Sequence, residues 1–325
     1  MVDVSELLAD APDNWGRWGD DDELGALNWL TAGEVLRGVG AVETGETFTL
    51  GVPIGASDGD PVWPTRAPAG HYVTQDQGTI DAGKRDREPF GHTGSADDLV
   101  HLHTHGTTHH DALGHVWYDD RLYNGFDART TNGGLERCGA EHVANHGIVG
   151  RAVLVDVARY RGVRALDADE RITLEELEGC LDEQGVELGG REILLLRTGC
   201  LDYFYAEGAD AFYDRYGDSE RSDALLEPGI TYTPEVVEWF RDNEVPAFCA
   251  DTITAEQTRS EETGTLIPLH PALLRDLGVV ITELVRLDAL AEACAADGRY
   301  ECLFVSGPLK IVGGTAAPAN PVAIR

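Results

Sequence analysis

The chain has 325 residues, 42% of them hydrophobic, which is enough to build a sizeable core. It carries 58 acidic residues against 25 Lys and Arg, and the resulting net charge of −33 disfavours binding to nucleic acid or to an anionic membrane. The acids are spread along the whole chain, and the only lysines are Lys84 and Lys310. This pattern is typical of proteins adapted to molar salt, because screening reduces the repulsion between like charges. We therefore expect the protein to work in the cytoplasm of a halophile.

The six cysteines are scattered without a CxxC pair, which excludes a zinc ribbon and predicts buried free thiols. The first residues lack the basic region and apolar run of a secretion signal. No apolar stretch approaches the ~20 residues that a membrane span requires. We expect a small-molecule substrate and neither a nucleic-acid nor a membrane partner.

Residues 1–45 are predicted to form an N-terminal arm that ends in a short helix, which Thr31 and Glu34 begin as a capping box. Trp15 and Trp18 could line a ligand pocket, but we favour a role in fixing this arm to the body. The alternating, β-branched residues 46–54 are predicted to form a strand.

Residues 55–95 are polar, rich in Gly and Pro and without periodicity, which predicts a long loop. A loop of this length is usually functional, as a lid or as a subunit contact. Within it, Trp63 lies between Pro61 and Pro64. Its ring is a candidate stacking surface for a planar substrate, although packing at an interface is equally compatible with the sequence.

A histidine-rich stretch follows, in which we expect residues 97–104 to form a strand and 108–116 to turn helically. Such a turn would bring together His105, His109, Asp111 and His115. Imidazole and carboxylate are the usual protein ligands of first-row divalent metals. The alternative is an exposed histidine tract that gains and loses protons but binds no metal. The interleaved Asp and the apolar flanks favour a partly buried metal site. Of the other histidines in the stretch, His103 is expected to contact a metal ligand without binding the metal itself. His101 and His110 are expected to be solvated or structural.

Strands and helices alternate in the second half, which indicates a layered α/β domain. We expect strands at 151–158, 192–199, 245–250, 279–285 and 300–306, and helices at 174–184, 233–242, 268–277 and 287–296. With no linker or internal repeat, residues 1–325 are expected to form a single domain.

Two residues of this half are candidate ligands. Glu283 lies in the apolar strand at 279–285, where an ionised carboxylate is costly unless it is paired or bound to metal. A Glu that faces outward from an edge strand is the alternative. His270, at the start of the preceding helix, is the only histidine after His146. Together, His270 and Glu283 suggest a second set of metal ligands.

The segment from His105 to His115 resembles the His-x-Gly-Thr-His-x-Asp-x-Pro-x-His signature of the metal-dependent cyclase-like hydrolases. This family includes bacterial-type kynurenine formamidase and isatin hydrolase. The unit from His270 to Glu283 resembles its second ligand segment, and Asp60-Pro-Val-Trp63-Pro its substrate-side tryptophan segment. Thr107 stands where the signature has Gly and Leu113 where it has Pro, but every candidate ligand is present.

The resemblance implies a layered β/β/α domain with a mixed central sheet, assembled as a homodimer or homotetramer. It also implies one or two divalent ions, Zn²⁺ or Mn²⁺. His105, His109 and Asp111 would hold the first ion, and Asp111 could bridge to a second site completed by His270 and Glu283.

The expected activity is hydrolysis of a C–N bond in a lactam or an N-formyl aryl amide by metal-activated water. His115 is the candidate general base and acid, and Trp63 the candidate substrate contact. A metal- or small-molecule-binding protein without catalytic activity is the alternative. A Ser-His-Asp hydrolase is disfavoured because the chain has no Gly-x-Ser-x-Gly elbow.

Overall fold

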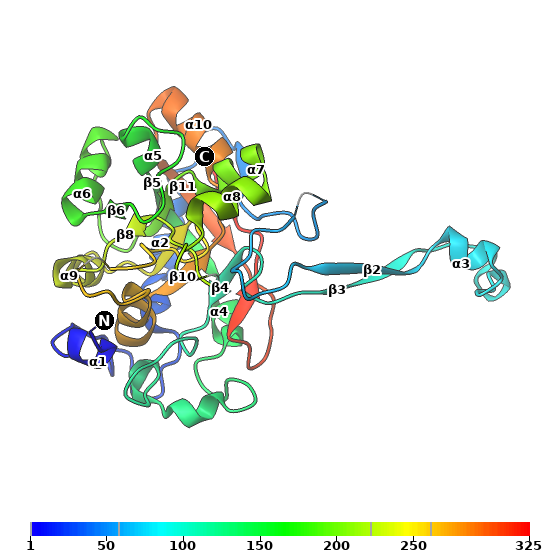
Figure 1. The fold of residues 1–325 in the computed structure, drawn as a ribbon, viewed down its shortest axis with the longest axis horizontal. Helices are drawn as coiled ribbons and strands as arrows, with labels where there is room; N and C mark the ends of the chain where they lie inside the picture. Colours follow the sequence, from blue (N-terminus) through cyan, green and yellow to red (C-terminus); the bar gives the residue numbers. More distant parts are fainter. Residues whose placement is uncertain (1, 58, 222, 261) are drawn as a thin grey trace.

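The computed structural model describes residues 2–57, 59–221, 223–260 and 262–325. Its centre is a nine-stranded sheet (Figure 1). In spatial order the strands are β1 (Thr47–Thr49), β13 (Val322–Ile324), β11 (Glu301–Ser306), β5 (Ile148–Asp156), β7 (Ile193–Arg197), β9 (Ala247–Ala250), β10 (Val280–Glu283), β4 (His109–Asp111) and β12 (Ala316–Pro318). Neighbours from β5 to β10 pair in parallel and all other neighbours are antiparallel, so the expected mixed sheet is confirmed.

Helices and short strands connect and cover this sheet. The α-helices of the body are α1 (Val4–Leu7), α2 (Ala32–Val39), α4 (Ala140–His146), α5 (Val157–Tyr160), α6 (Leu174–Glu183), α7 (Cys200–Glu207), α8 (Ala209–Tyr216), α9 (Pro234–Asp242) and α10 (Asp288–Asp297). The remaining elements of the body are the 3₁₀ helices η1 (Gly25–Trp29), η3 (Tyr123–Gly125) and η4 (Ala128–Thr131), the π-helix η5 (Pro271–Leu277), and the paired strands β6 (Arg171–Ile172) and β8 (Gly229–Ile230).

Threonine side chains cap two of the helices that were expected from the sequence. Thr173 accepts a hydrogen bond from the Glu176 amide at the start of α6, and Thr233 accepts one from Val236 at the start of α9. The capping box expected at Thr31 is wrong, because its side chain forms no capping hydrogen bond. Glu34 is held instead by ion pairs to arginines of α2 and of the segment before β7.

The parallel strands form the centre of the core. Every residue of β7, β9 and β10 is buried, and one apolar cluster includes residues from Leu8 to Ala323. Helix α2 lies so close to β5 that a Cβ atom on Gly38 would stand 2.7 Å from the backbone of Gly150. The buried apolar strands expected from the sequence are therefore confirmed.

The N-terminal segment packs on this body. The Trp15 indole donates a hydrogen bond to the Arg275 carbonyl at 2.8 Å, and the Arg275 guanidinium lies over the Trp15 ring. Trp18 packs edge-on against Trp29 of η1. These contacts support the structural role that the sequence favours for the two tryptophans.

An arm projects from the body, and its outer end lies far from the sheet (Figure 1). It consists of β2 (Gly70–Gln75), α3 (Gln77–Asp81), η2 (Glu88–Phe90) and β3 (Asp97–His101), with β2 and β3 paired only with each other. The expectation of an irregular loop over 55–95 is therefore wrong for its second half. Polar residues lie on both faces of these strands, so they lack the alternation by which a half-buried strand is recognised.

The six cysteines are free and buried, as expected. Within the described ranges, no helix combines the length and the apolar character that crossing a membrane requires.

Candidate metal centre

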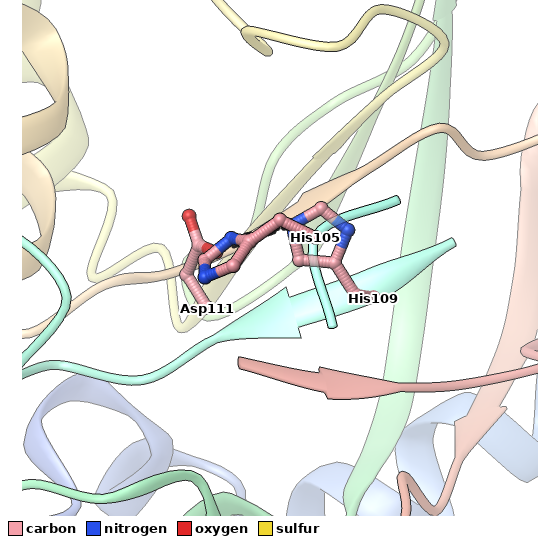
Figure 2. A group of neighbouring side chains, drawn as sticks. All are labelled: His105, His109 and Asp111. Carbon is pink, nitrogen blue, oxygen red and sulfur yellow. Dashed lines mark hydrogen bonds and ion pairs between the residues drawn. The ribbon is translucent and has the colours of Figure 1, made fainter. Parts of the chain in front are cut away.

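Three of the candidate ligands come from a loop and the strand that follows it. The helical turn expected at 108–116 is wrong, because His109, His110 and Asp111 form β4, a strand buried between β10 and β12. Alternate residues of a strand point to the same face, so His109 and Asp111 share one side. His105 reaches them from the preceding turn (Figure 2).

His110 points to the other face of β4, where its ring nitrogens hydrogen-bond the hydroxyl groups of Thr282 and Ser306 at 2.7 and 2.6 Å. This residue is therefore structural. His101 and His103 are exposed, so the supporting role expected for His103 is wrong.

The second pair of candidate ligands meets the first across the sheet. Glu283 is paired with His109 in the β10–β4 register, which places their side chains on the same face. Glu283 therefore faces the site from an inner strand, not outward from an edge. His270 precedes η5, and its Nε2 lies 3.2 Å from Glu283 Oε1.

The ligand atoms are spaced as a bound ion requires. Asp111 Oδ1 lies 3.1 Å from His105 Nδ1 and 3.2 Å from His109 Nε2, and Glu283 Oε2 lies 3.2 Å from His109 Nε2. Ligands at ~2.1 Å from a tetrahedral ion would stand about 3.4 Å from one another. Both oxygens of the buried Asp111 lack a hydrogen-bond partner among the described residues. An oxygen acceptor left unpaired in the interior is costly, and a cation bound there would remove that cost.

Each histidine of the cluster is oriented through its other ring nitrogen. His109 Nδ1 donates to the Thr107 carbonyl at 2.7 Å, and His270 Nδ1 donates to Glu256 at 2.5 Å. His105 Nε2 lies 3.1 Å from the Thr315 hydroxyl. Such outer contacts fix the tautomer and leave the inner nitrogen free to bind metal. The donor set fits a divalent first-row ion, and Asp111 belongs to both candidate triads, one with His105 and His109 and one with His270 and Glu283.

The charged groups of the cluster shift one another's pKa values. Burial opposes a charged imidazole, but Asp111 and Glu283 outweigh it and raise the pKa of His109 to about 10. Burial likewise opposes a charged His270, but Glu256 and Glu283 raise its pKa to about 10. Burial also opposes the ionisation of Glu283, but His109 and His270 lower its pKa to about 2. A divalent ion would displace the two imidazole protons, so metal binding should release protons.

His115 lies beside this cluster without a partner of its own. Its ring stacks on His105 with the centroids 4.2 Å apart, and it is partly exposed. Burial of the ring lowers the pKa of His115 to about 3, against the opposing effect of Asp111. No described residue hydrogen-bonds its ring nitrogens, so they remain available to a ligand.

A cavity of about 260 Å³ opens onto the centre. Its lining residues are Trp63, Arg66, His115, Ile253, Thr254, Ile267, His270 and Glu283. The structure thus brings Trp63 to the site together with His115 and two candidate ligands. Ile267 has a φ of +42°, a strained conformation for a β-branched residue, and strain of this kind concentrates at functional sites.

The departures from the signature have structural explanations. Thr107 acts through its carbonyl, which any residue supplies, and Leu113 packs in the main core. Sequence reasoning missed Thr315, Glu256 and Arg66. Thr315 is 210 residues from the histidine that it contacts, so no local pattern could reveal it.

Comparisons with known proteins show the family and the fold of the chain. Residues 48–257 match a family model described as "Putative cyclase". A solved structure described as a novel cyclase is 36% identical, covers 97% of this chain and 100% of its own, and superimposes with a TM-score of 0.82. Isatin hydrolase A from Ralstonia solanacearum is 21% identical over 86% of this chain and 92% of its own, with a TM-score of 0.62.

Isatin hydrolase A from Labrenzia aggregata is 18% identical over 92% of this chain and 98% of its own, with a TM-score of 0.59. At these identities the two isatin hydrolases show a shared fold alone. No protein of curated function matches the sequence. From the family match and the 36% identity over nearly the whole length, this chain belongs to the cyclase family.

Proposed function

We propose that this protein is a metal-dependent hydrolase that cleaves the C–N bond of a lactam or an N-formyl aryl amide. The observation that carries the proposal is a single cavity lined by His115, Trp63 and two of the five clustered metal-ligand candidates. Binding alone needs a ligand set, whereas hydrolysis also needs a free proton acceptor and room for a substrate.

The metal is proposed to be Zn²⁺ or Mn²⁺, as one or two ions. His105, His109 and Asp111 would hold the first ion, and Asp111, His270 and Glu283 would hold a second. A divalent ion there would polarise the substrate carbonyl and make water acidic enough to attack near neutral pH.

The residues of the chain supply the proton transfers. His115 accepts a proton as the water oxygen bonds to the carbonyl carbon. When the C–N bond breaks, His115 returns this proton to the leaving nitrogen, so that the products are a carboxylic acid and an amine. Trp63 provides a flat face against which an aromatic ring can stack.

The first experiment is elemental analysis of the wild type and Glu283→Ala, purified in high salt. A fall from near two equivalents towards one would support the binuclear site. One equivalent in both proteins would leave a mononuclear site held by His105, His109 and Asp111. Failure to bind metal, even after reconstitution, would refute the hydrolase proposal.

The second experiment separates catalysis from metal binding. We expect His115→Ala to lose turnover of formanilides and lactams while keeping its metal. Loss of metal in this variant would make His115 a ligand. A wild type that binds metal but turns over none of these substrates would favour the binding protein without catalytic activity.

We also propose that the arm docks on a second copy of the chain, giving a homodimer or homotetramer. Tyr72, Val73, Leu99 and Val100 of β2 and β3 are each about half exposed, and the described body does not cover them. The segment 84–88 carries three basic and two acidic residues, whereas the whole chain has a net charge of −33. This charge difference favours contact between segment 84–88 and the acidic surface of another copy, although residues 70–101 as a whole carry six acids against three Lys and Arg.

The acidic composition leads us to propose a cytoplasm of high salt as the setting. We expect the melting temperature to rise between low and molar KCl as repulsion among the acids is screened. A melting temperature that is independent of salt would argue against this setting.

A further inference from the structure

Arg66 lines the cavity of about 260 Å³ at the candidate metal centre, called the metal cavity below, and has no carboxylate partner. Its guanidinium donates one hydrogen bond, from Nη1 to the His105 carbonyl at 2.9 Å. Among the described residues, no Asp or Glu forms an ion pair with it. The other half-buried or buried arginines of the body are paired, as Arg259 is with Asp218 and Arg197 with Asp156, whereas Arg85 and Arg87 of the arm form no ion pair with a described residue. The positive charge of Arg66 is therefore available to a ligand.

The segment that carries Arg66 is fixed in place. The buried Asp60 carboxylate accepts hydrogen bonds from the amides of Gly55, Ala56 and Ala69, which closes the loop around Trp63 and Arg66. The Tyr213 hydroxyl accepts from the Val62 amide and donates to the Val62 carbonyl. The hydrogen bonds to Asp60 thus come from backbone donors, and Asp60 forms no ion pair with Arg66. A residue held this firmly can bind a ligand without first being ordered.

Arg66 also lines a second, larger cavity of about 650 Å³. Apolar side chains make up much of its wall, including Val62, Pro64, Pro68 and Leu225. Three aspartates, Asp60, Asp214 and Asp218, also line it, and Asp218 is paired with Arg259. Arg66 lies where this apolar cavity and the metal cavity meet. A ligand that bridges them would present a charged or polar group to the guanidinium and an apolar body to the larger space.

We propose that Arg66 recognises a carboxylate on the substrate, so that the natural substrate is an anionic amide with an apolar portion. Calling the ligand a substrate rests on the proposed hydrolase function, but binding of an anion at Arg66 does not depend on turnover. An arginine matches a carboxylate because its planar fork can donate two parallel hydrogen bonds. In a protein with 58 acids, an unpaired arginine at the metal cavity also selects against cationic ligands.

The test measures binding and turnover separately. Isothermal titration calorimetry on the metal-loaded protein would compare benzoate with its neutral analogue benzamide, for wild type, Arg66→Gln, Arg66→Lys and Arg87→Gln. Arg87 is the matched control because it lies on the arm, where it also lacks an ion pair among the described residues. We expect Arg66→Gln to weaken benzoate at least tenfold and benzamide less than twofold. Arg66→Lys should keep part of the benzoate affinity, and Arg87→Gln should match the wild type.

Kinetics with N-formylanthranilate and formanilide, an acid and a neutral compound of otherwise similar shape, would complete the test. Arg66→Gln should raise KM for the acid at least tenfold and leave KM for the neutral amide unchanged. Equal benzoate affinity in the wild type and Arg66→Gln would overturn the proposal. Loss of metal in Arg66→Gln would also overturn it, because Arg66 would then serve only to position the His105 loop. Absence of turnover with intact Arg66-dependent benzoate binding would refute the hydrolase proposal alone.

Discussion

Strands β3 and β4 are separated only by residues 102–108, yet all five side chains of β3 are exposed and all three of β4 are buried. β4 is paired on both sides, and its polar side chains contact Thr282 and Glu283 of β10, Ser306 of β11 and His270 just before η5. β3 is paired only with β2, and a hairpin of two strands is at best marginally stable alone. In β4, charged groups are held by neighbours that the chain itself supplies. In the arm, apolar groups lie without such neighbours, which suggests that their partner is another molecule.

The largest effect should come from Asp111, which belongs to both candidate triads. If the proposed metal site is correct, Asp111→Asn should lose most of its bound metal and lower kcat/KM by at least about 10³-fold, because the ion would supply the attacking water and polarise the carbonyl. Elemental analysis and initial rates would measure both, with circular dichroism as a check on folding. The matched control is Asp98→Asn on the arm, which should leave both quantities unchanged. Full metal content in Asp111→Asn would remove Asp111 from the ligand set.

Substitutions on the arm should change subunit assembly and leave metal binding intact. Tyr72 and Leu99 are opposite each other in the β2–β3 register, and both are exposed. Replacing both with Asp should raise the dissociation constant of the proposed oligomer at least tenfold, because charge would enter an apolar contact. Light scattering after gel filtration would measure the mass, and metal content should not change.

Val163→Asp on the body is the matched control for the arm variant, since Val163 is also an exposed apolar residue. An oligomer that withstands the double substitution on the arm would place the subunit contact elsewhere.

A third test uses Glu227, a buried carboxylate near the metal centre. Burial raises the pKa of Glu227 to about 8, against the hydrogen bond from the Ile253 amide. The metal-free folded protein then keeps a proton that the unfolded chain releases above pH ~4.3. The contribution of Glu227 to the free energy of unfolding should therefore fall as pH rises from about 4.5 to 8.

Glu227→Gln removes this titration. Over that pH range, the free energy of unfolding of the variant should therefore rise by about 1–3 kcal/mol relative to that of the wild type. Urea denaturation of chelator-treated wild type and variant at several pH values would show it. Parallel pH profiles would mean that Glu227 is ionised in the folded protein.

The smallest effect is expected at the ion pair between His71 and Asp98, 2.7 Å apart across the arm. Both side chains are about half exposed, so solvent and salt screen their attraction. Asp98→Asn should lower the free energy of unfolding by less than about 1 kcal/mol. A larger loss in urea denaturation would mean that the arm is more tightly coupled to the body than its contacts indicate.

The sequence predicts the chemistry of the site better than its geometry. His105, His109 and Asp111 are recognisable because buried metal sites use few residue types, and the structure brings them together. Their backbone was expected to be helical because four-residue spacings fit a helix turn. His109 and Asp111, two residues apart, instead share one face of a strand, and a strand of three residues is too short for its alternation to be recognised in the sequence.

Other features depend on contacts between distant segments, which local patterns do not encode. Glu256 supports His270, and Thr315 supports His105, only after the sheet has formed. Arg66 was missed for a similar reason, since an arginine in a Gly- and Pro-rich segment resembles any solvated charge. The buried strands were predictable, because long apolar runs have few alternatives to the core.

The scarcity of lysine makes the arm a selective site for chemical labelling. Lys84 lies in the arm just beyond α3 and is exposed, and the only other lysine, Lys310, is exposed on the body after β11. Amine-reactive dyes can therefore modify just two side chains, besides the terminal amino group. In a Lys310→Arg protein, the single modified side chain would be the one on the arm. Mixing donor- and acceptor-labelled samples would then report subunit exchange through energy transfer, without a cysteine having to be introduced.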